Sequence, residues 1–120
     1  MEKFHDKLKI KIDEFVHLVY GASKNFPREE IYGVTSQIRR AALSVMLNYI
    51  EGFARIKPKV NLNFLETSYG SLKETKYLLH FSLKENYLNE TDYQKTMKLA
   101  EEIGAMLWKT IESIKKARST

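Results

Sequence analysis

The chain has 120 residues, which suits a single domain with a modest core, because domains commonly run to about 100–150 residues. Cysteine is absent, which excludes a disulfide scaffold, a thiolate zinc site and a cysteine nucleophile. Lysine and arginine total 20 against 15 aspartates and glutamates, a net charge of +5. That balance permits a phosphate-bearing partner without requiring one.

Targeting and membrane segments are not expected. A transmembrane helix needs about 20 mostly apolar residues, and the longest near-apolar stretch, residues 41–50, already contains Ser44 and Asn48. The first residues alternate charge and apolarity and lack the apolar middle of a signal peptide. We therefore expect no membrane partner, and the lack of cysteine is compatible with a cytoplasmic location.

Apolar periodicity predicts four helices, at residues 3–23, 27–56, 60–87 and 91–118. Pro27 suits a first helical position, and Glu29 and Glu30 favour the positive end of the helix dipole there. Pro58 separates the second helix from the third. Thr91 with Gln94 three residues later forms a capping-box pattern that would start the fourth helix.

A heptad seam marks the third predicted helix. Leu65, Leu72 and Leu79 repeat every seven residues, and small residues beside them at the same interval are typical of tight helix packing: Ser68, Thr75 and Ser82. Lys76 lies near this seam, so we expect it to snorkel to solvent or to pair across the bundle. Short connections imply antiparallel neighbours, and the sequence predicts one domain over residues 1–120, an all-α up-down-up-down four-helix bundle.

The second helix carries apolar residues on two opposite faces. One stripe suits a bundle core: Val34, Ile38, Ala41, Ala42, Val45 and Tyr49. The other stripe, roughly opposite, would meet water in a lone bundle: Leu43, Leu47, Ile50 and Ala54. An exposed apolar patch on a small soluble protein usually marks an interaction surface. We interpret the outer stripe as a subunit interface; the alternative is that loops or the terminal helices cover it.

Two adjacent arginines, Arg39 and Arg40, flank the outer stripe, and their side chains point about 100° apart on a helix. Arg40 shares a polar edge with Glu51 and Arg55. This edge has two interpretations. In the first, Glu51 and Arg55 form an ion pair at the border of an interface. In the second, assembly gathers the copies of Arg39 or Arg40 into a basic ring that could hold phosphates.

Charge is expected to be unequal between the two ends of an antiparallel bundle. One end collects the N-terminus, the second connection and the C-terminus, where a few acids, chiefly Glu2, Asp6 and Glu112, face a larger set of basic residues: Lys3, Lys7, Arg55, Lys57, Lys59, Lys115, Lys116 and Arg118. The other end collects acids: Glu29, Glu30, Glu85, Glu90 and Asp92, against Lys24, Arg28 and Lys84. The basic end suits an RNA or DNA backbone or an acidic protein surface. Complementing the helix dipole would explain the basic C-terminus but not Lys57 and Lys59. No aromatic platform is evident in the basic stretches, so base-specific recognition is not predicted.

An enzyme is not expected. Bundles can hold two metals with Glu-x-x-His motifs from two helices, but here both such motifs, Glu2–His5 and Glu14–His17, lie on the first helix and cannot converge. Instead of acting as metal ligands, the histidines are expected to be solvated at the surface. Gly-rich phosphate loops and nucleophile-elbow motifs are missing from the sequence. We predict no catalytic residues, no metal and no cofactor.

The segment around the start of the second helix is distinctive. The run from Phe26 to Ala42, followed by Ser44, Asn48, Glu51-Gly52 and Arg55, resembles the bacterial four-helix bundle family that includes proteins encoded by intervening sequences in large-subunit ribosomal RNA genes. Phe64-Leu65, Gly70-Ser71-Leu72 and Glu74 look like that family's third-helix motif. The resemblance covers nearly the whole chain.

The family is similar in fold to the accessory protein of diversity-generating retroelements. The resemblance implies a ring of five bundles that binds nucleic acid and a reverse transcriptase, with Arg39, Arg40 and Arg55 as candidate basic positions. We therefore expect a non-enzymatic homo-oligomer, in five copies, that binds RNA or DNA electrostatically. The alternative is an adaptor that binds a protein partner and never touches nucleic acid.

Overall fold

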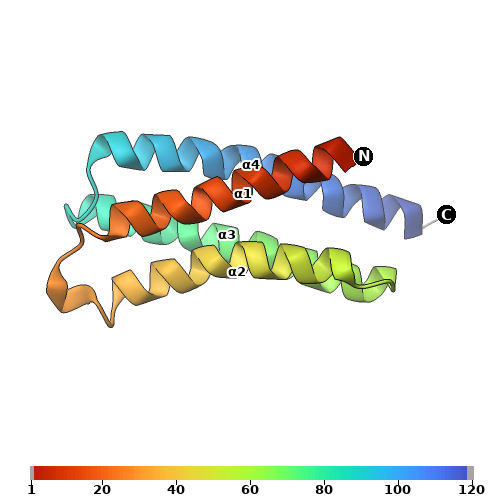
Figure 1. The fold of residues 1–120 in the computed structure, drawn as a ribbon, viewed down its shortest axis with the longest axis horizontal. Coiled ribbons are helices and arrows are strands. Elements are labelled where there is room, and N and C mark those ends of the chain that lie inside the picture. The colour runs from red at the N-terminus through yellow and green to blue at the C-terminus, as the bar shows by residue number, and fades with distance from the viewer. Residues whose placement is uncertain (1, 119–120) are drawn as a thin grey trace.

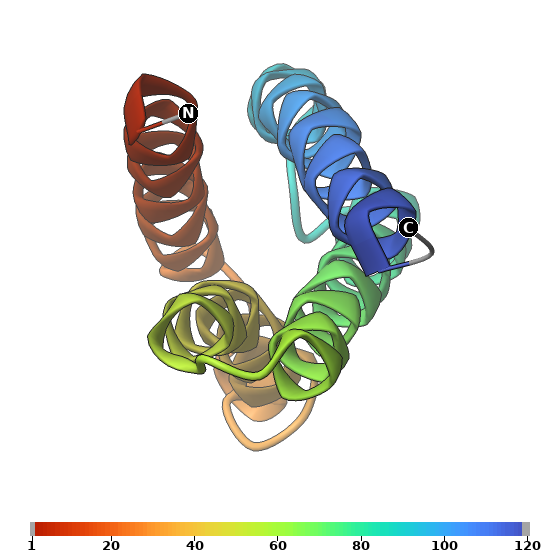
Figure 2. The ribbon, with the colours of Figure 1, turned by 90° about the vertical axis from the view of Figure 1, so that its right-hand side faces the viewer.

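The structure is a computed structural model that describes residues 2–118, and helices are the only regular secondary structure among these residues. The elements are α1 (Glu2–Ser23), the short 3₁₀ helix η1 (Arg28–Glu30), α2 (Val34–Ala54), α3 (Pro58–Lys84) and α4 (Glu90–Arg118). Successive long helices run in opposite directions (Figure 1). Each packs against its neighbour in the chain, and α4 also packs against α1. Viewed from the end that carries the two termini, the four helices are arranged in a U, with α1 and α4 as its two arms (Figure 2). The predicted antiparallel four-helix bundle is confirmed.

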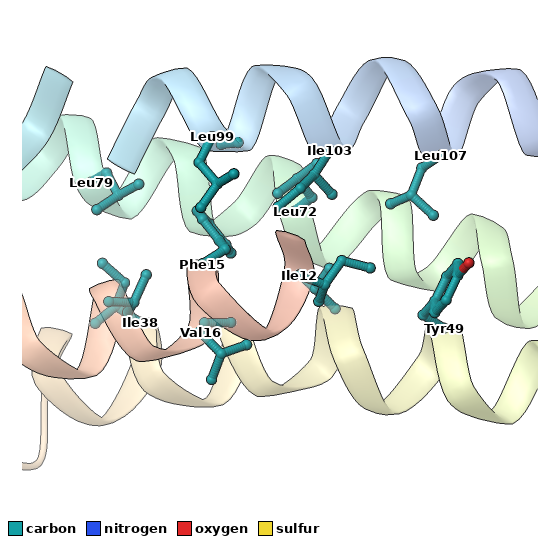
Figure 3. Close-up of a cluster of buried hydrophobic side chains, with 14 of the residues drawn as sticks. Ile12, Phe15, Val16, Ile38, Tyr49, Leu72, Leu79, Leu99, Ile103 and Leu107 are labelled. Carbon is teal, nitrogen blue, oxygen red and sulfur yellow. The ribbon is translucent and has the colours of Figure 1, made fainter. Parts of the chain in front are cut away.

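The core consists of the inner apolar stripes of all four helices (Figure 3). Phe15 and Ile12 from α1 are fully buried, and Ile103 and Leu107 meet them from α4. The inner stripe of α2 contributes Ile38, Val45 and Tyr49. The heptad leucines of α3 are buried as predicted: Leu65, Leu72 and Leu79. The periodicity at 3.6 residues is therefore what places the core.

Small residues bring α2 and α3 close together. Ser68 on α3 is fully buried, and its hydroxyl donates to the backbone carbonyl of Val45 on α2 at 2.6 Å. A Cβ added to Gly52 would lie 3.0 Å from Leu65 Cδ2, closer than ordinary contact, so the lack of a side chain at position 52 lets the last turn of α2 lie on α3 without displacing Leu65. The small residues of the seam thus do what their spacing predicted.

The second helix begins later than the sequence predicted, at Val34 and not at Pro27. Pro27 instead precedes η1, and a turn follows. The start of α2 is capped from behind: Glu30 Oε1 accepts from the backbone N–H of Val34 at 3.1 Å. A Cβ at Gly33 would lie 2.5 Å from that carboxylate oxygen, so glycine is what allows the carboxylate to approach. The acidic residues near Pro27 therefore serve a different helix start from the one predicted.

The connection between α2 and α3 has the predicted length of three residues but lies two residues earlier in the chain. α2 ends at Ala54 rather than at Ile56, and α3 begins at Pro58 rather than at Val60, with Pro58 in the first turn, where its missing N–H costs nothing.

α3 ends at Lys84 rather than at Tyr87, because Asn86 adopts a left-handed φ of 63°. The N–H of Tyr87 donates to the carbonyl of Ser82 at 2.8 Å and that of Asn86 to Leu83 at 3.1 Å, which together form a Schellman turn.

The cap of α4 differs from the predicted capping box. The helix starts at Glu90, one residue earlier than expected. Asn89 caps it: its Oδ1 accepts from the backbone N–H of Asp92 at 2.7 Å. Gln94 bonds the Glu90 carboxylate at 2.8 Å and does not reach back to Thr91 as a capping box requires. Asparagine is as good a cap as threonine, so the helix start shifted by one residue.

Candidate oligomer and nucleic-acid interfaces

The outer stripe of α2 is exposed in the single chain. Leu43, Leu47 and Ile50 are 37%, 61% and 44% exposed, and Ala54 at the end of the helix is exposed too. Neither the connections nor the terminal helices cover these four residues within the part of the chain that the structure describes. Burial by the chain's own loops, the alternative to a subunit interface, therefore does not occur over residues 2–118.

The apolar surface extends beyond the predicted stripe. Phe53, 41% exposed, adjoins it on α2, and Ile10 on α1 is 68% exposed. Ile10 and Ile50 line the same shallow groove between the two helices, with Asp6 and Asp13 at its edge. We call this surface the outer patch: Ile10, Leu43, Leu47, Ile50, Phe53 and Ala54. Widening the α2 stripe beyond Ile50 and Ala54 would have found Phe53, but Ile10 required the pairing of α1 with α2.

Arg39 is engaged inside its own bundle. Its Nε donates to Ser23 Oγ at 2.7 Å, and its guanidinium lies 5.0 Å from the centre of the Tyr20 ring. Both partners belong to α1, so this half-buried arginine fastens α2 to the end of α1. A charge held in this way is poorly placed to bind a phosphate.

Arg40 is exposed and faces away from Arg39, towards α3. It lines a polar cavity of about 510 Å³ between α2 and α3, together with Ser44, Ser71 and Glu74. The two serine hydroxyls lie 2.7 Å apart, and so form a hydrogen bond. At 1.5 Å per residue, about 22 Å of helix separates Arg40 from Arg55, so the three candidate arginines do not form one patch within a single bundle.

The remaining candidate cations gather at one end of the bundle. The α2–α3 connection and the end of α4 lie at that end (Figure 1), and six exposed basic residues stand there: Arg55, Lys57, Lys59, Lys115, Lys116 and Arg118. We call this set the basic end. Arg55 pairs with Glu51 at 2.9 Å, as predicted, and Lys115 with Glu66 at 3.4 Å.

Lys57 and Lys59 stand out at the basic end. Both are exposed, and neither forms an ion pair with any residue among positions 2–118. Helix-dipole complementarity does not account for them, because they lie at the start of α3, where the dipole favours anions. Their charges are therefore available to an external anion.

The opposite end is acidic and tightly bonded. Glu30 accepts from Tyr87 Oη at 3.3 Å as well as from the start of α2, and so joins the first connection to the α3–α4 turn. The polar groups around the start of α4 bond each other, as Asn89 and Asp92 do. Hydrogen bonds therefore hold the two connections of the acidic end together.

A cavity of about 410 Å³ opens at the basic end, lined by residues of all four helices. His5, on its wall, lies 3.2 Å from Tyr49 Oη and packs edge-on against Phe53. Burial lowers the pKa of His5, and burial, aided by the charge of Asp6, raises the pKa of Tyr49 to about 12. The interpretation of His5 as a solvated histidine is therefore wrong.

No sequence pattern predicted the two aromatic rings that meet in a groove between α3 and α4. Tyr69 and Trp108 lie with their ring centres 5.7 Å apart, and Trp108 is 50% exposed. Lys73 Nζ stands 5.3 Å from the centre of the Tyr69 ring. The two rings come from different helices, so no local sequence pattern joins them; only the antiparallel register of α3 and α4 does.

Metal-binding geometry is not found in the described residues: no three of their histidine, aspartate or glutamate side chains come together as a ligand set. Nor is any helix within residues 2–118 both long and apolar enough to cross a bilayer. Lys76 pairs with Glu101 across the bundle at 2.8 Å, as predicted, and that pairing lowers the pKa of Glu101.

Comparison with known proteins identifies the family. No curated protein matches the chain. A solved structure from Bacteroides thetaiotaomicron VPI-5482, described as a protein of unknown function from the S23 ribosomal protein family, superposes with a TM-score of 0.84. It is 22% identical over 91% of this chain and 98% of its own, which shows a common fold. The model of the 23S rRNA-intervening sequence protein family matches residues 7–109. No enzymatic activity is attached to either description. Because the family model covers most of this four-helix chain, the chain belongs to the 23S rRNA-intervening sequence protein family.

Proposed function

We propose that the protein is a non-enzymatic homo-oligomer that binds RNA or DNA electrostatically through its basic end. The observation that carries this proposal is the position of Lys57 and Lys59, two exposed cations without ion pairs among the described residues. Arg55, Lys115, Lys116 and Arg118 are exposed in the segments that lie at the same end of the bundle, the α2–α3 connection and the end of α4 (Figure 1). A cluster of this kind attracts a phosphate backbone and releases its counterions.

Assembly follows from the outer patch. Leu47 and Ile50 expose apolar surface on a helix face whose spacing suits helix–helix contact. Burial against a second copy removes that surface from water at about 25 cal/mol per Å². A closed ring needs two different contact surfaces on each copy, and five is the number of copies that the family resemblance implies. A ring would gather the basic ends of several bundles, which multiplies weak phosphate contacts.

The nucleic-acid proposal is tested by salt dependence. The logarithm of affinity for a single strand should fall with the logarithm of salt, with a slope of about −0.7 per phosphate contact. We expect the double variant Lys57→Gln/Lys59→Gln to make that slope shallower by about 1.4 in an anisotropy titration with labelled RNA. A salt-independent affinity of the unaltered protein would contradict the proposal.

The matched control removes the same charge from the other end. Lys24→Gln/Lys84→Gln changes the net charge by the same two units at exposed positions of the acidic end. Its salt slope should equal that of the unaltered protein. Equal effects of the two double variants would mean that net charge alone, and not the basic end, determines binding.

The assembly proposal is tested by mass in solution. Leu47→Glu places a charge in the middle of the outer patch, and light scattering should then report a single chain where the unaltered protein reports several. Ile31→Glu makes the same chemical change at a residue that is 53% exposed in the first connection, and the oligomeric mass should persist. An unaltered protein that is a single chain at all concentrations would end the assembly proposal.

A second candidate function is favoured by the outer patch itself, which suits a protein partner as well as a second copy. In this case the chain is an adaptor that never touches nucleic acid, and the family resemblance suggests a reverse transcriptase as one such partner. Isolation of the complex from its native host after nuclease treatment separates the two. A partner that stays bound after nuclease and is lost in Leu47→Glu favours the adaptor.

A further inference from the structure

The groove between α3 and α4 is built from a small set of residues with distinct roles. Its volume is about 350 Å³, at the lower end of the range of about 300–1,000 Å³ for small-ligand sites. Gly104 and Ala105 keep its α4 side low, since neither has a side chain long enough to fill it. Tyr69 and Trp108 form one wall. The groove thus presents aromatic surface above a floor that is open to a flat ligand.

Cations border the same groove. Lys73 stands over the Tyr69 ring at 5.3 Å and forms no ion pair with residues 2–118. Lys76 also lines the groove, where Glu101 neutralises it at 2.8 Å. The groove therefore carries one uncompensated positive charge beside its aromatic wall. An apolar peptide helix would gain no attraction from that charge, whereas an anionic ligand with an aromatic ring would.

The groove leads toward the basic end. Trp108 and Lys115 are seven residues apart on α4 and so lie on one face of the helix, about 10 Å apart along its axis. Glu66 and Tyr69 follow the same course on α3, and Lys115 pairs with Glu66 at 3.4 Å. A nucleic-acid backbone held at the basic end can extend along this face into the groove.

We propose that the α3–α4 groove is a stacking site for an unpaired base of a single-stranded nucleic acid, with Trp108 as the stacking surface, Tyr69 as its support and Lys73 as a contact to the adjacent phosphate. This inference rests on the proposed nucleic-acid function. Single-strand binding proteins combine aromatic stacking surfaces with a cationic path along the backbone in this way. Bases inside a duplex are already stacked on each other, so a duplex cannot use the site.

The test uses the chain's own fluorescence, because Trp108 is its single tryptophan. Titration with oligo(dT) should quench the Trp108 emission in step with the anisotropy change of the labelled strand. Titration with the oligo(dT)·oligo(dA) duplex should leave the emission unchanged even where the duplex binds to the basic end. This measurement needs no variant, so it does not depend on the folding of an altered chain.

Variants separate stacking from charge. Trp108→Leu should weaken oligo(dT) binding about tenfold with an unchanged salt slope, since stacking releases no counterions, and Trp108→Phe should restore most of the affinity. The matched control is Tyr32→Leu, which removes an aromatic ring that is 95% exposed in the first connection, and it should bind as the unaltered protein does. Lys73→Met should weaken binding and also make the salt slope shallower by about 0.7.

Each result that contradicts the inference has its own meaning. Oligo(dT) binding with unchanged Trp108 emission overturns the stacking site and leaves the proposed function intact. A Trp108 emission that shifts with protein concentration alone places the groove at a contact between copies, and also overturns it. No binding of oligo(dT), of the duplex or of the labelled RNA by anisotropy removes the proposed function itself.

Discussion

The two ends of the bundle differ in how they are held together. At the acidic end, a Schellman turn, an asparagine cap and the Glu30 carboxylate satisfy the polar groups of two connections. At the basic end, a cavity of about 410 Å³ remains between the four helices, and the lysines of the connection are exposed and free of ion pairs among residues 2–118. The two connections at the acidic end are therefore held by more hydrogen bonds than the connection at the basic end, where exposed charge is left over. The following substitutions test that contrast.

The largest expected effect comes from the packed core near the acidic end. Leu79→Ala removes a side chain that is 1% exposed, and it should lower the free energy of unfolding by about 2–5 kcal/mol. Ile114→Ala, on the wall of the cavity at the basic end, should cost only about 1 kcal/mol, because its side chain is partly buried. Urea denaturation measures both. Equal costs would mean that the two ends are equally well packed.

The stability of the acidic end should depend on the Glu30 carboxylate. Glu30→Ala removes the cap of α2 and leaves the Tyr87 hydroxyl without this partner, so we expect a loss of about 1–2 kcal/mol in the free energy of unfolding. The neighbouring Glu29→Ala, at an exposed position, should stay within about 0.5 kcal/mol. If both variants unfold at the same urea concentration, Glu30 does not act as a cap.

Acid should lower the stability of the fold through His5 at the basic end. Burial holds the pKa of His5 in the folded chain below its ordinary value of 6.5. At a pH between the folded and the unfolded pKa, the unfolded chain therefore binds more protons than the folded chain, and stability falls as pH falls. The melting temperature should therefore drop between pH 7.5 and 5.5, and less so in His5→Gln. His17→Gln, at a residue with 76% side-chain exposure, should keep the pH dependence of the unaltered protein.

The smallest effect is expected from the ion pair beside the connection. Glu51→Gln breaks the contact with Arg55, but both side chains are about half exposed, so the cost should be at most about 0.5 kcal/mol. The same variant frees Arg55 to meet a phosphate, and RNA should bind slightly more tightly in the anisotropy assay. A large loss of stability would show that this pair belongs to the fold rather than to the surface.

Much of the fold was predictable because periodicity records burial. The heptad leucines of α3 and the inner stripe of α2 both follow from helical spacing. Helix ends were less predictable, because they depend on groups that meet only after folding. Pro27 and Glu30 suggested one helix start, yet the Glu30 carboxylate bonds to the backbone N–H of Val34, an approach that the missing side chain of Gly33 permits.

The candidate sites divide in the same way. The outer stripe of α2 was predictable from one helix, and its exposure follows from the same spacing. The Tyr69–Trp108 pair was not, since its two rings come from helices that the sequence does not align. Arg39 was misjudged for a related reason: its partners, Ser23 and Tyr20, lie on another helix.

The helices α1 and α4 have their outer ends on the same side as the basic residues (Figure 1). An affinity tag fused to either terminus therefore stands next to the surface that the binding assays measure. A polyhistidine tag would add cations there, and an acidic epitope would neutralise the lysines electrostatically. Binding experiments on this protein consequently call for a cleavable tag, with the affinity compared before and after its removal.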